Sequence, residues 1–250
     1  MKKKVSSQIG WHGDYFTWND AVKETTGYND DVVLRKVKES LLKVKKGEAV
    51  YERDSVLFYK QEYSWPFLSC LMYIAAYSKG KLNVVDFGGS LGSSYFQNKR
   101  FFKGLEELSW NVVEQEEFVS CGNELFEDDS LKFSSSLDEC LNRRHANVLL
   151  LSSVLPYLEN PYNFIKDVVG EGFEFIIVDR TGFTFDNTTR LTVQKVDPEI
   201  YDASYPCWFF SKTKFLDLFS DRYDLLFEFD ALDEANIPSV YKGFCFKKKS

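Results

Sequence analysis

The chain has few of the residues that build metal centres or disulfide frameworks. It contains two histidines and five cysteines, the cysteines are widely scattered, and none of them belongs to a Cys-x-x-Cys pair. Zinc sites and disulfide-rich scaffolds both need such residues at short, paired spacings. We therefore expect neither a metal site nor a disulfide framework, and two histidines are too few for a histidine-based catalytic centre.

A basic excess and a long apolar run are also missing. The formal net charge is −7, so the chain lacks the basic surface that binds nucleic acid. No stretch approaches the roughly 18 consecutive apolar residues that span a membrane, and the lysines at 2–4 are not followed by the apolar segment of a secretory signal. We expect a cytoplasmic protein that binds a small molecule, with no nucleic acid and no membrane span. The oligomeric state is not predicted.

From residue 82 onward, apolar runs alternate with helical patterns, which is typical of βαβ units. Expected strands lie at 82–87, 110–114, 131–134, 147–152 and 173–179, with a helix over 93–108 after the first. Two last runs, 223–229 and 240–247, are close enough to pair as a hairpin. The pattern predicts an α/β fold, a doubly wound, mostly parallel seven-stranded sheet with an antiparallel C-terminal hairpin.

The chain divides at about residue 81. Residues 1–81 are expected to form a helical extension, whose first helix ends at Gly27 and whose aromatic-rich segment 51–65 is a candidate lid. Residues 82–250 are expected to form the Rossmann-like domain. Within it, 180–210 is too long for an ordinary connection and too aromatic for disorder. We expect an irregular insertion there, on the substrate side.

A glycine-rich turn follows the first expected strand. Asp86 ends the strand, and Gly88, Gly89 and Gly92 precede the next helix. Glycine has no Cβ, so the backbone can approach a ligand closely at such positions. In open α/β sheets, ligands bind at the edge formed by the carboxyl ends of the strands. The turn is therefore the expected centre of a ligand site.

The dinucleotide fingerprint Gly-x-Gly-x-x-Gly is absent from this turn. Counted from Gly88 it needs glycines at 90 and 93, where the chain has Ser90 and Ser93. Asp86 would also repel a pyrophosphate, whereas it suits a cationic ligand such as a sulfonium amino acid. A second acid, Glu114, ends the second expected strand, where a carboxylate can bind both hydroxyls of a ribose.

These features resemble the class I, Rossmann-like S-adenosylmethionine-dependent methyltransferases. The most specific part is Val84-Val85-Asp86-Phe87-Gly88-Gly89-Ser90-Leu91-Gly92, in which members more often have glycine in place of Ser90. Segments 18–21, 26–28, 88–97, 177–181 and 201–208 also resemble a poorly characterised bacterial methyltransferase family associated with surface-polysaccharide gene clusters. The resemblance implies methyl transfer from S-adenosylmethionine to a small acceptor, an oxygen of a sugar or sugar nucleotide in polysaccharide biosynthesis.

The resemblance also implies roles for residues of the binding edge. The residues that would surround the methionine part of the cofactor are Asp86, Gly88, Gly89, Ser90 and Gly92. Glu114 would bind its ribose, Ser135 would lie by the adenine, and Ser152 and Ser153 would form the floor near the sulfonium. For Ser135 and Ser152, capping of the next helix is an equal alternative.

No residue is an obvious general base for a hydroxyl acceptor. Asp179 ends the fifth expected strand at the binding edge and is the first catalytic candidate, with Tyr157 as the second. The alternative for Asp179 is a structural ion pair with the neighbouring Arg180. Arg180, Tyr201 and Tyr205 are candidates for binding the acceptor.

Two other functions stay open. A non-catalytic S-adenosylmethionine-binding protein would hold the cofactor without transferring its methyl group. An NAD(P)-linked sugar-modifying enzyme would bind a dinucleotide instead, and Ser90 and Ser93 argue against it.

Overall fold

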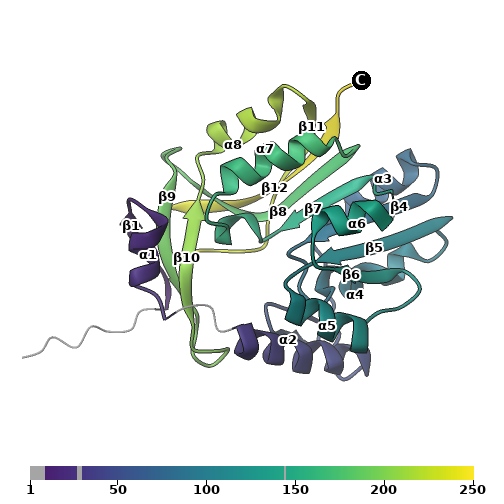
Figure 1. Ribbon diagram of the computed structural model, residues 1–250, viewed down its shortest axis with the longest axis horizontal. Coiled ribbons are helices and arrows are strands. Elements are labelled where there is room, and N and C mark those ends of the chain that lie inside the picture. Colours follow the sequence, from purple (N-terminus) through teal and green to yellow (C-terminus); the bar gives the residue numbers. More distant parts are fainter. Residues whose placement is uncertain (1–8, 27–29, 144) are drawn as a thin grey trace, which may run out of the picture.

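The computed structural model describes residues 9–26, 30–143 and 145–250, and a seven-stranded sheet runs through its centre (Figure 1). The strand order is β11-β12-β8-β7-β4-β5-β6. The strands are β4 (Lys81–Phe87), β5 (Glu107–Val113), β6 (Leu131–Ser134), β7 (Val148–Ser152), β8 (Phe175–Thr184), β11 (Tyr223–Asp230) and β12 (Ser239–Lys248). Strands β4 to β8 pair in parallel, and β12 is antiparallel to both β8 and β11. The predicted fold class is confirmed.

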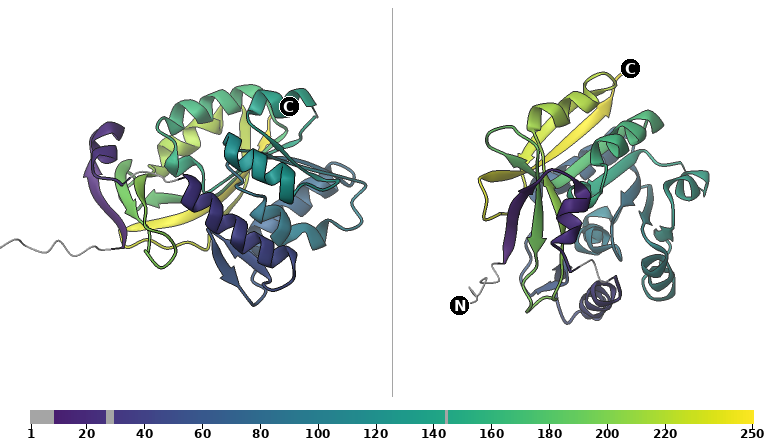
Figure 2. Two further views of the ribbon diagram at one scale, coloured as in Figure 1. Left: turned by 60° about the horizontal axis from the view of Figure 1, so that its bottom comes forward. Right: turned by 60° about the vertical axis from the view of Figure 1, so that its left-hand side comes forward.

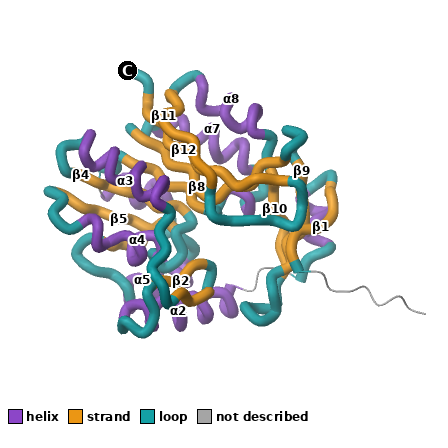
Figure 3. Tube along the Cα trace, turned by 180° about the vertical axis from the view of Figure 1, so that it is seen from behind, coloured by secondary structure: helices purple, strands orange, loops and turns teal. Residues whose placement is uncertain are grey.

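Helices cover both faces of this sheet, which explains why its strands are apolar on both sides (Figures 1 and 3). One face packs against α2 (Asp30–Lys45), α3 (Trp65–Tyr77), α4 (Ser93–Asn98) and α5 (Glu116–Leu125). The other packs against α6 (Leu137–Arg143), α7 (Pro161–Glu171) and α8 (Lys212–Ser220). Along β4, Val84 faces the first layer and Val85 the second. In the described ranges no helix is long and apolar enough to cross a membrane.

The helix after β4 is shorter than predicted. The expected helix over 93–108 is wrong in length, because α4 ends at Asn98 and continues only as a 3₁₀ turn, η1 (Lys99–Phe102). The side-chain amide of Asn98 donates to the carbonyl of Ser94 at 2.9 Å. Such side-chain bonds to the backbone compete with a regular helix.

A second, three-stranded antiparallel sheet stands beyond the end of β8 (Figures 1 and 2). Its strands are β1 (Gly10–Tyr15), β9 (Arg190–Lys195) and β10 (Ser204–Phe209), in the order β1-β9-β10. The expectation of an irregular insertion over 180–210 is therefore wrong, since β8 continues to Thr184 and two strands follow. One face of this sheet packs on α1 (Trp18–Lys23) through Ala21, Leu191 and Val193.

The N-terminal part of the chain is not purely helical, which corrects the expectation for residues 1–81. Besides β1, it contains a short hairpin of β2 (Tyr51–Arg53) and β3 (Val56–Phe58) between α2 and α3. The turn of this hairpin places both Asp54 and Ser55 at positive φ, 51° and 69°, as a two-residue turn of type I′ requires. The predicted end of the first helix at Gly27 lies outside the described residues.

Candidate functional site

The carboxyl ends of β4, β7 and β8 meet at one edge of the main sheet, and several residues there have a strained backbone conformation. Three non-glycine residues at this edge have positive φ, namely Ser90 (55°), Ser153 (56°) and Arg180 (53°). This conformation costs free energy for residues with a Cβ, and it clusters at functional sites because the surrounding structure has to enforce it. The strained positions therefore mark this edge as the candidate site.

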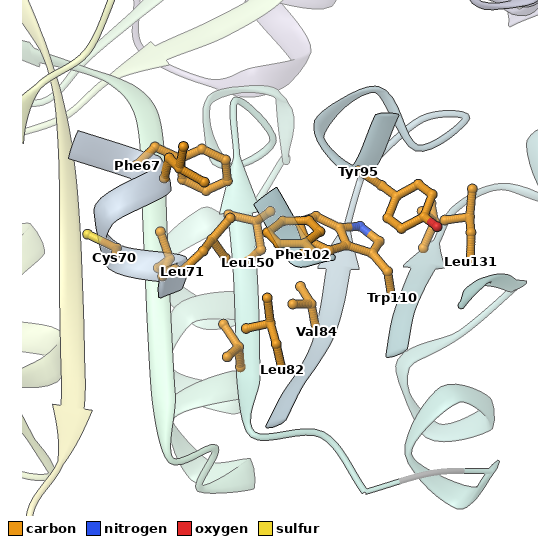
Figure 4. Close-up of a cluster of buried hydrophobic side chains, with 14 of the residues drawn as sticks. Phe67, Cys70, Leu71, Leu82, Val84, Tyr95, Phe102, Trp110, Leu131 and Leu150 are labelled. Carbon is orange, nitrogen blue, oxygen red and sulfur yellow. The ribbon is translucent and has the colours of Figure 1, made fainter. Parts of the chain in front are cut away.

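Asp86 is the buried acid at the centre of this edge. Only 1% of the residue is exposed, and the indole Nε1 of Trp110 donates to its Oδ2 at 2.9 Å. Figure 4 shows Trp110 within the apolar cluster between the sheet and its first helical layer. Burial raises the pKa of Asp86 to about 7, the bond from Trp110 opposes this shift, and the charge of Glu114 adds to it. None of the ion pairs formed by the described residues includes Asp86, so no basic side chain neutralises this acid.

The glycine turn is shaped around this carboxyl group. A Cβ at Gly89 would lie 2.4 Å from Cγ of Asp86, so no larger residue fits without displacing the acid. At Gly88, which has φ 71°, a Cβ would lie 2.4 Å from Cγ2 of Val154. Gly92 is left-handed at φ 90° and is the N-cap of α4. The turn can therefore present bare backbone to a ligand.

Glu114 lies against the same turn. Its Oε1 accepts from the backbone N–H of Ser90 at 3.2 Å, and its Oε2 accepts from the N–H of Gln115 at 3.0 Å. The structure therefore brings Glu114 to the turn that follows Asp86, as the sequence predicts. A carboxylate accepts hydrogen bonds at both of its oxygens, which is the chemistry that binds a pair of ribose hydroxyls.

The three serines differ in their surroundings. Both N–H and Oγ of Ser135 bond to the carboxylate of Glu139, at 2.8 and 3.0 Å, so this residue takes part in capping α6. Ser152 lies at the end of β7, with its Oγ 3.5 Å from Oδ2 of Asp179. The N–H of Ser153 donates to the carbonyl of Asp179 at 3.0 Å. Ser152 and Ser153 thus line the edge beside β8, whereas Ser135 is tied to a helix.

Asp179 is 4% exposed, and its Oδ1 is buried with no hydrogen-bond partner in the structure. Burial raises its pKa to about 6. Its carboxyl group forms no ion pair with the side chain of Arg180, which corrects that alternative. The guanidinium instead forms a bidentate pair with Asp233, at 2.8 and 2.9 Å, and contacts Asp54 in the β2–β3 turn.

The three tyrosines form one group beside the three-stranded sheet. The hydroxyl of Tyr157 donates to Oε1 of Gln194 on β9 at 2.9 Å, and its ring meets Tyr205 edge-on at 5.3 Å between centroids. The hydroxyls of Tyr201 and Tyr205 lie 3.4 Å apart. Burial raises the pKa of Tyr157 well above its usual value, so it serves as a hydrogen-bond donor rather than as a base at neutral pH.

Two residues of this edge are absent from the sequence-based predictions. Trp110 holds Asp86, and Glu52 on β2 places a 2%-exposed carboxylate against Ser93, whose hydroxyl donates to it. Burial raises the pKa of Glu52 to about 7, and the bond from Ser93 opposes this shift. No local pattern marks either residue, because both contacts are made between side chains of different elements.

Other features lie away from this edge. His145 lines a hollow of about 360 Å³ with Tyr77, Glu174 and the last lysines, at the opposite ends of the strands. His12 pairs with Val193, on the side of the small sheet that faces α1. In the part of the chain that the structure describes, no group of three His, Cys, Asp or Glu side chains is placed to hold a metal ion.

No family model and no curated protein matches this chain, whereas solved structures do. It is similar to the N-terminal domain of EvdMO1 solved in the presence of S-adenosylhomocysteine and D-fucose, with 12% identity over 86% of this chain and 97% of that one, at a TM-score of 0.50. It is also similar to an S-adenosylmethionine-dependent methyltransferase from Clostridium acetobutylicum ATCC 824, with 10% identity over 76% and 93% of the two chains, at a TM-score of 0.50. The chain therefore shares the α/β fold of these two proteins.

Proposed function

We propose that this chain transfers a methyl group from S-adenosylmethionine to an oxygen of a small, sugar-type acceptor. The observation that carries the proposal is the buried carboxyl group of Asp86 beneath Gly89, at the binding edge of a methyltransferase fold. A sulfonium amino acid carries two positive charges near its methionine part, and an anionic edge attracts them.

The same charge argues against a dinucleotide. The pyrophosphate of NAD would have to rest on the turn between β4 and α4, beside Asp86 and Glu114, and like charges at that range repel. Ser90 replaces a fingerprint glycine and adopts φ 55° there. A dinucleotide-binding turn needs glycine for close backbone approach, so this turn favours the sulfonium cofactor.

The cofactor would lie along the carboxyl ends of β4, β5 and β7. Asp86, Gly88, Gly89, Ser90 and Gly92 would surround the methionine part, and Glu114 would bind the ribose hydroxyls. Ser152 and Ser153 would form the floor near the sulfonium. Ser135 would contact the adenine through its backbone, because its hydroxyl bonds to Glu139. Bound cofactor supplies an activated methyl group with a neutral thioether as leaving group.

The acceptor would lie between Asp179 and the tyrosines beside the small sheet. The rings and hydroxyls of Tyr157, Tyr201 and Tyr205 are of the kind that bind sugars. Arg180 would border the acceptor site, held in place by its ion pairs with Asp54 and Asp233. The N-terminal domain of EvdMO1, which has the same fold, was crystallised in the presence of D-fucose. A sugar nucleotide of polysaccharide biosynthesis is the acceptor class that we propose.

In the transfer step, the acceptor oxygen attacks the methyl carbon in line with the bond to sulfur. The new O–C bond forms as the C–S bond breaks, and the electron pair of that bond stays on sulfur. Oδ1 of Asp179 would take the hydroxyl proton, because this atom is buried and has no hydrogen-bond partner. The pKa of the Asp179 carboxyl group is raised to about 6, which suits a general base near neutral pH. Most of the rate would come from positioning and from exclusion of water.

Methyl transfer to a panel of sugars and sugar nucleotides tests this proposal with two variants. We expect Asp179→Asn to lower turnover by about 10²–10⁴-fold while S-adenosylhomocysteine still binds. Asp167→Asn, on the exposed side of α7, is the matched control and should retain full activity. Cofactor binding without transfer to any acceptor would favour the non-catalytic alternative. Binding of NAD or NADP in place of S-adenosylhomocysteine would overturn the proposal.

A further inference from the structure

A second buried acid adjoins the glycine turn from outside the main sheet. Glu52, in the middle of β2, is 2% exposed although it belongs to a three-residue strand on the N-terminal hairpin. Its Oε1 accepts from the hydroxyl of Ser93, and its Oε2 accepts from the N–H of Ser55 at 3.1 Å. A carboxylate is rarely buried to this degree unless it is paired, so its position calls for a physical reason.

The protein itself does not supply a counter-charge for this carboxylate. None of the ion pairs formed by the described residues includes Glu52. Arg180, the cation whose charge reaches it, already pairs with Asp54 and Asp233, and the charge of Asp54 repels Glu52. Two neutral hydrogen bonds do not offset the desolvation of an ionised carboxylate. A cationic group bound beside Glu52 would offset it.

The position of Ser93 links this acid to the cofactor site. Ser93 directly follows Gly92 and begins α4, so Glu52 lies at the far end of the turn whose near end rests on Asp86. The hydroxyl oxygens of Ser55 and Ser90, on the hairpin and on the turn, are buried and lack partners. The turn thus has a carboxyl group at each end and unsatisfied polar atoms near both.

We propose that Glu52 is a cofactor-binding residue, which takes the α-ammonium group of the methionine part. This inference rests on the proposed function, and it assigns to the N-terminal hairpin a part of the cofactor site. Asp86 acts from below the turn and Glu52 from the hairpin side. Because Asp54 on the same hairpin contacts Arg180, the hairpin also joins the cofactor side of the edge to the acceptor side.

A comparison of two ligands on two proteins isolates this contact. Isothermal titration of the full chain would compare S-adenosylhomocysteine with its analogue that lacks the amino group, on wild type and on Glu52→Gln. We expect Glu52→Gln to weaken S-adenosylhomocysteine by 10–100-fold and the deaminated analogue by less than threefold. Glu48→Gln, an exposed acid just before the hairpin, is the matched control and should change neither affinity.

The shorter acid Glu52→Asp keeps the charge and provides a second variant if Glu52→Gln does not fold. We expect it to weaken S-adenosylhomocysteine by an intermediate factor and again to spare the analogue. Equal loss for both ligands would assign Glu52 a purely structural role and overturn the inference, as would no loss for either. Failure of the wild type to bind S-adenosylhomocysteine would instead overturn the proposed function.

Discussion

The indole of Trp110 on β5 donates its N–H to the carboxyl group of Asp86 on β4. The two strands are parallel neighbours, and Val84 lies beside Trp110 in the register. The indole ring therefore extends along the sheet to Asp86, which follows Val84 on the same face of β4. Both residues are almost fully buried. The hydrogen bond fixes the orientation of the acid at the point where the glycine turn begins.

Trp110→Phe removes this donor and should weaken the cofactor site. A hydrogen bond to a charged group contributes about 1.5–3 kcal/mol, and without it the pKa of Asp86 rises further above 7. We expect S-adenosylhomocysteine to bind about tenfold more weakly at neutral pH, as measured by isothermal titration. Phe102→Leu is the control, because Phe102 stacks on Trp110 whereas the hydrogen bond to Asp86 comes from the indole N–H. It should lower the unfolding free energy and leave the affinity unchanged; equal affinities in both variants would contradict the role of the indole.

Gly89→Ala should disrupt the turn, because the new methyl group would lie 2.4 Å from Cγ of Asp86. The acid or the turn has to shift, and we expect at least tenfold weaker cofactor binding with a lower Tm. Gly170→Ala in α7 is the matched control, since its Cβ meets nothing within 4 Å. There alanine should stabilise the protein by about 0.5–1 kcal/mol. A Gly89→Ala protein with wild-type affinity would show that the turn does not hold the ligand.

The stability of the cofactor-free protein should fall as pH rises from about 4 to about 7. The carboxyl groups of Asp86, Glu52 and Asp179 have pKa values raised by burial, to about 7, 7 and 6. In this window the folded state still holds protons that the unfolded chain has released. The slope of the unfolding free energy against pH is therefore negative. Each raised pKa unit corresponds to about 1.4 kcal/mol.

Urea unfolding at pH 5 and pH 8 measures this dependence. Asp86→Asn should reduce the difference between the two pH values, because an amide does not titrate. A protein equally stable at both pH values, or more stable at pH 8, would show that these acids do not carry raised pKa values in the folded state.

Arg180→Met should destabilise the protein by about 3–5 kcal/mol, because Asp233 is left largely buried without its partner. Arg180→Lys should also be harmful, since an ammonium cannot reproduce the bidentate geometry. Denaturant unfolding provides the measurement, and adding Asp233→Asn should recover part of the loss. Lys242→Met is the control: of its two partners, Asp230 is 78% exposed and Glu228 keeps its pair with Lys212, so we expect a cost under about 1 kcal/mol. Similar losses of unfolding free energy in both variants would contradict a stabilising role of the Arg180–Asp233 pair.

The main sheet could be predicted from the sequence because its strands are marked locally. Runs such as Val148 to Leu151 are apolar on both faces and lie between helical patterns. The small sheet carries no such mark, because β1 pairs with β9 across most of the chain, with Trp11 beside Gln194. Pro206 lies within β10, although proline is rare in strands, because β10 is an edge strand, where proline is tolerated.

The candidate site was predictable to the same extent. Asp86 and Glu114 follow strands of the main sheet, so strand order alone brings them to one edge. Glu52 reaches this edge through packing of the β2–β3 hairpin, which is separated from β4 in the chain by α3. Trp110 lies on the strand next to β4, but its hydrogen bond to Asp86 depends on side-chain packing that the sequence pattern does not reveal. The hydrogen-bonding role of Tyr157 depends on Gln194 of the small sheet, which sequence patterns did not reveal.

Thermal unfolding of the full chain with S-adenosylhomocysteine, NAD or NADP tests the central claim most directly. A ligand at 100 times its Kd adds about 2.7 kcal/mol to the unfolding free energy, which raises the Tm of a chain of this size by roughly 5–10 °C. We predict this shift with S-adenosylhomocysteine alone, and its loss in Asp86→Asn. A shift with NAD or NADP and none with S-adenosylhomocysteine would contradict the account, because the acid beneath the glycine turn would then face a pyrophosphate.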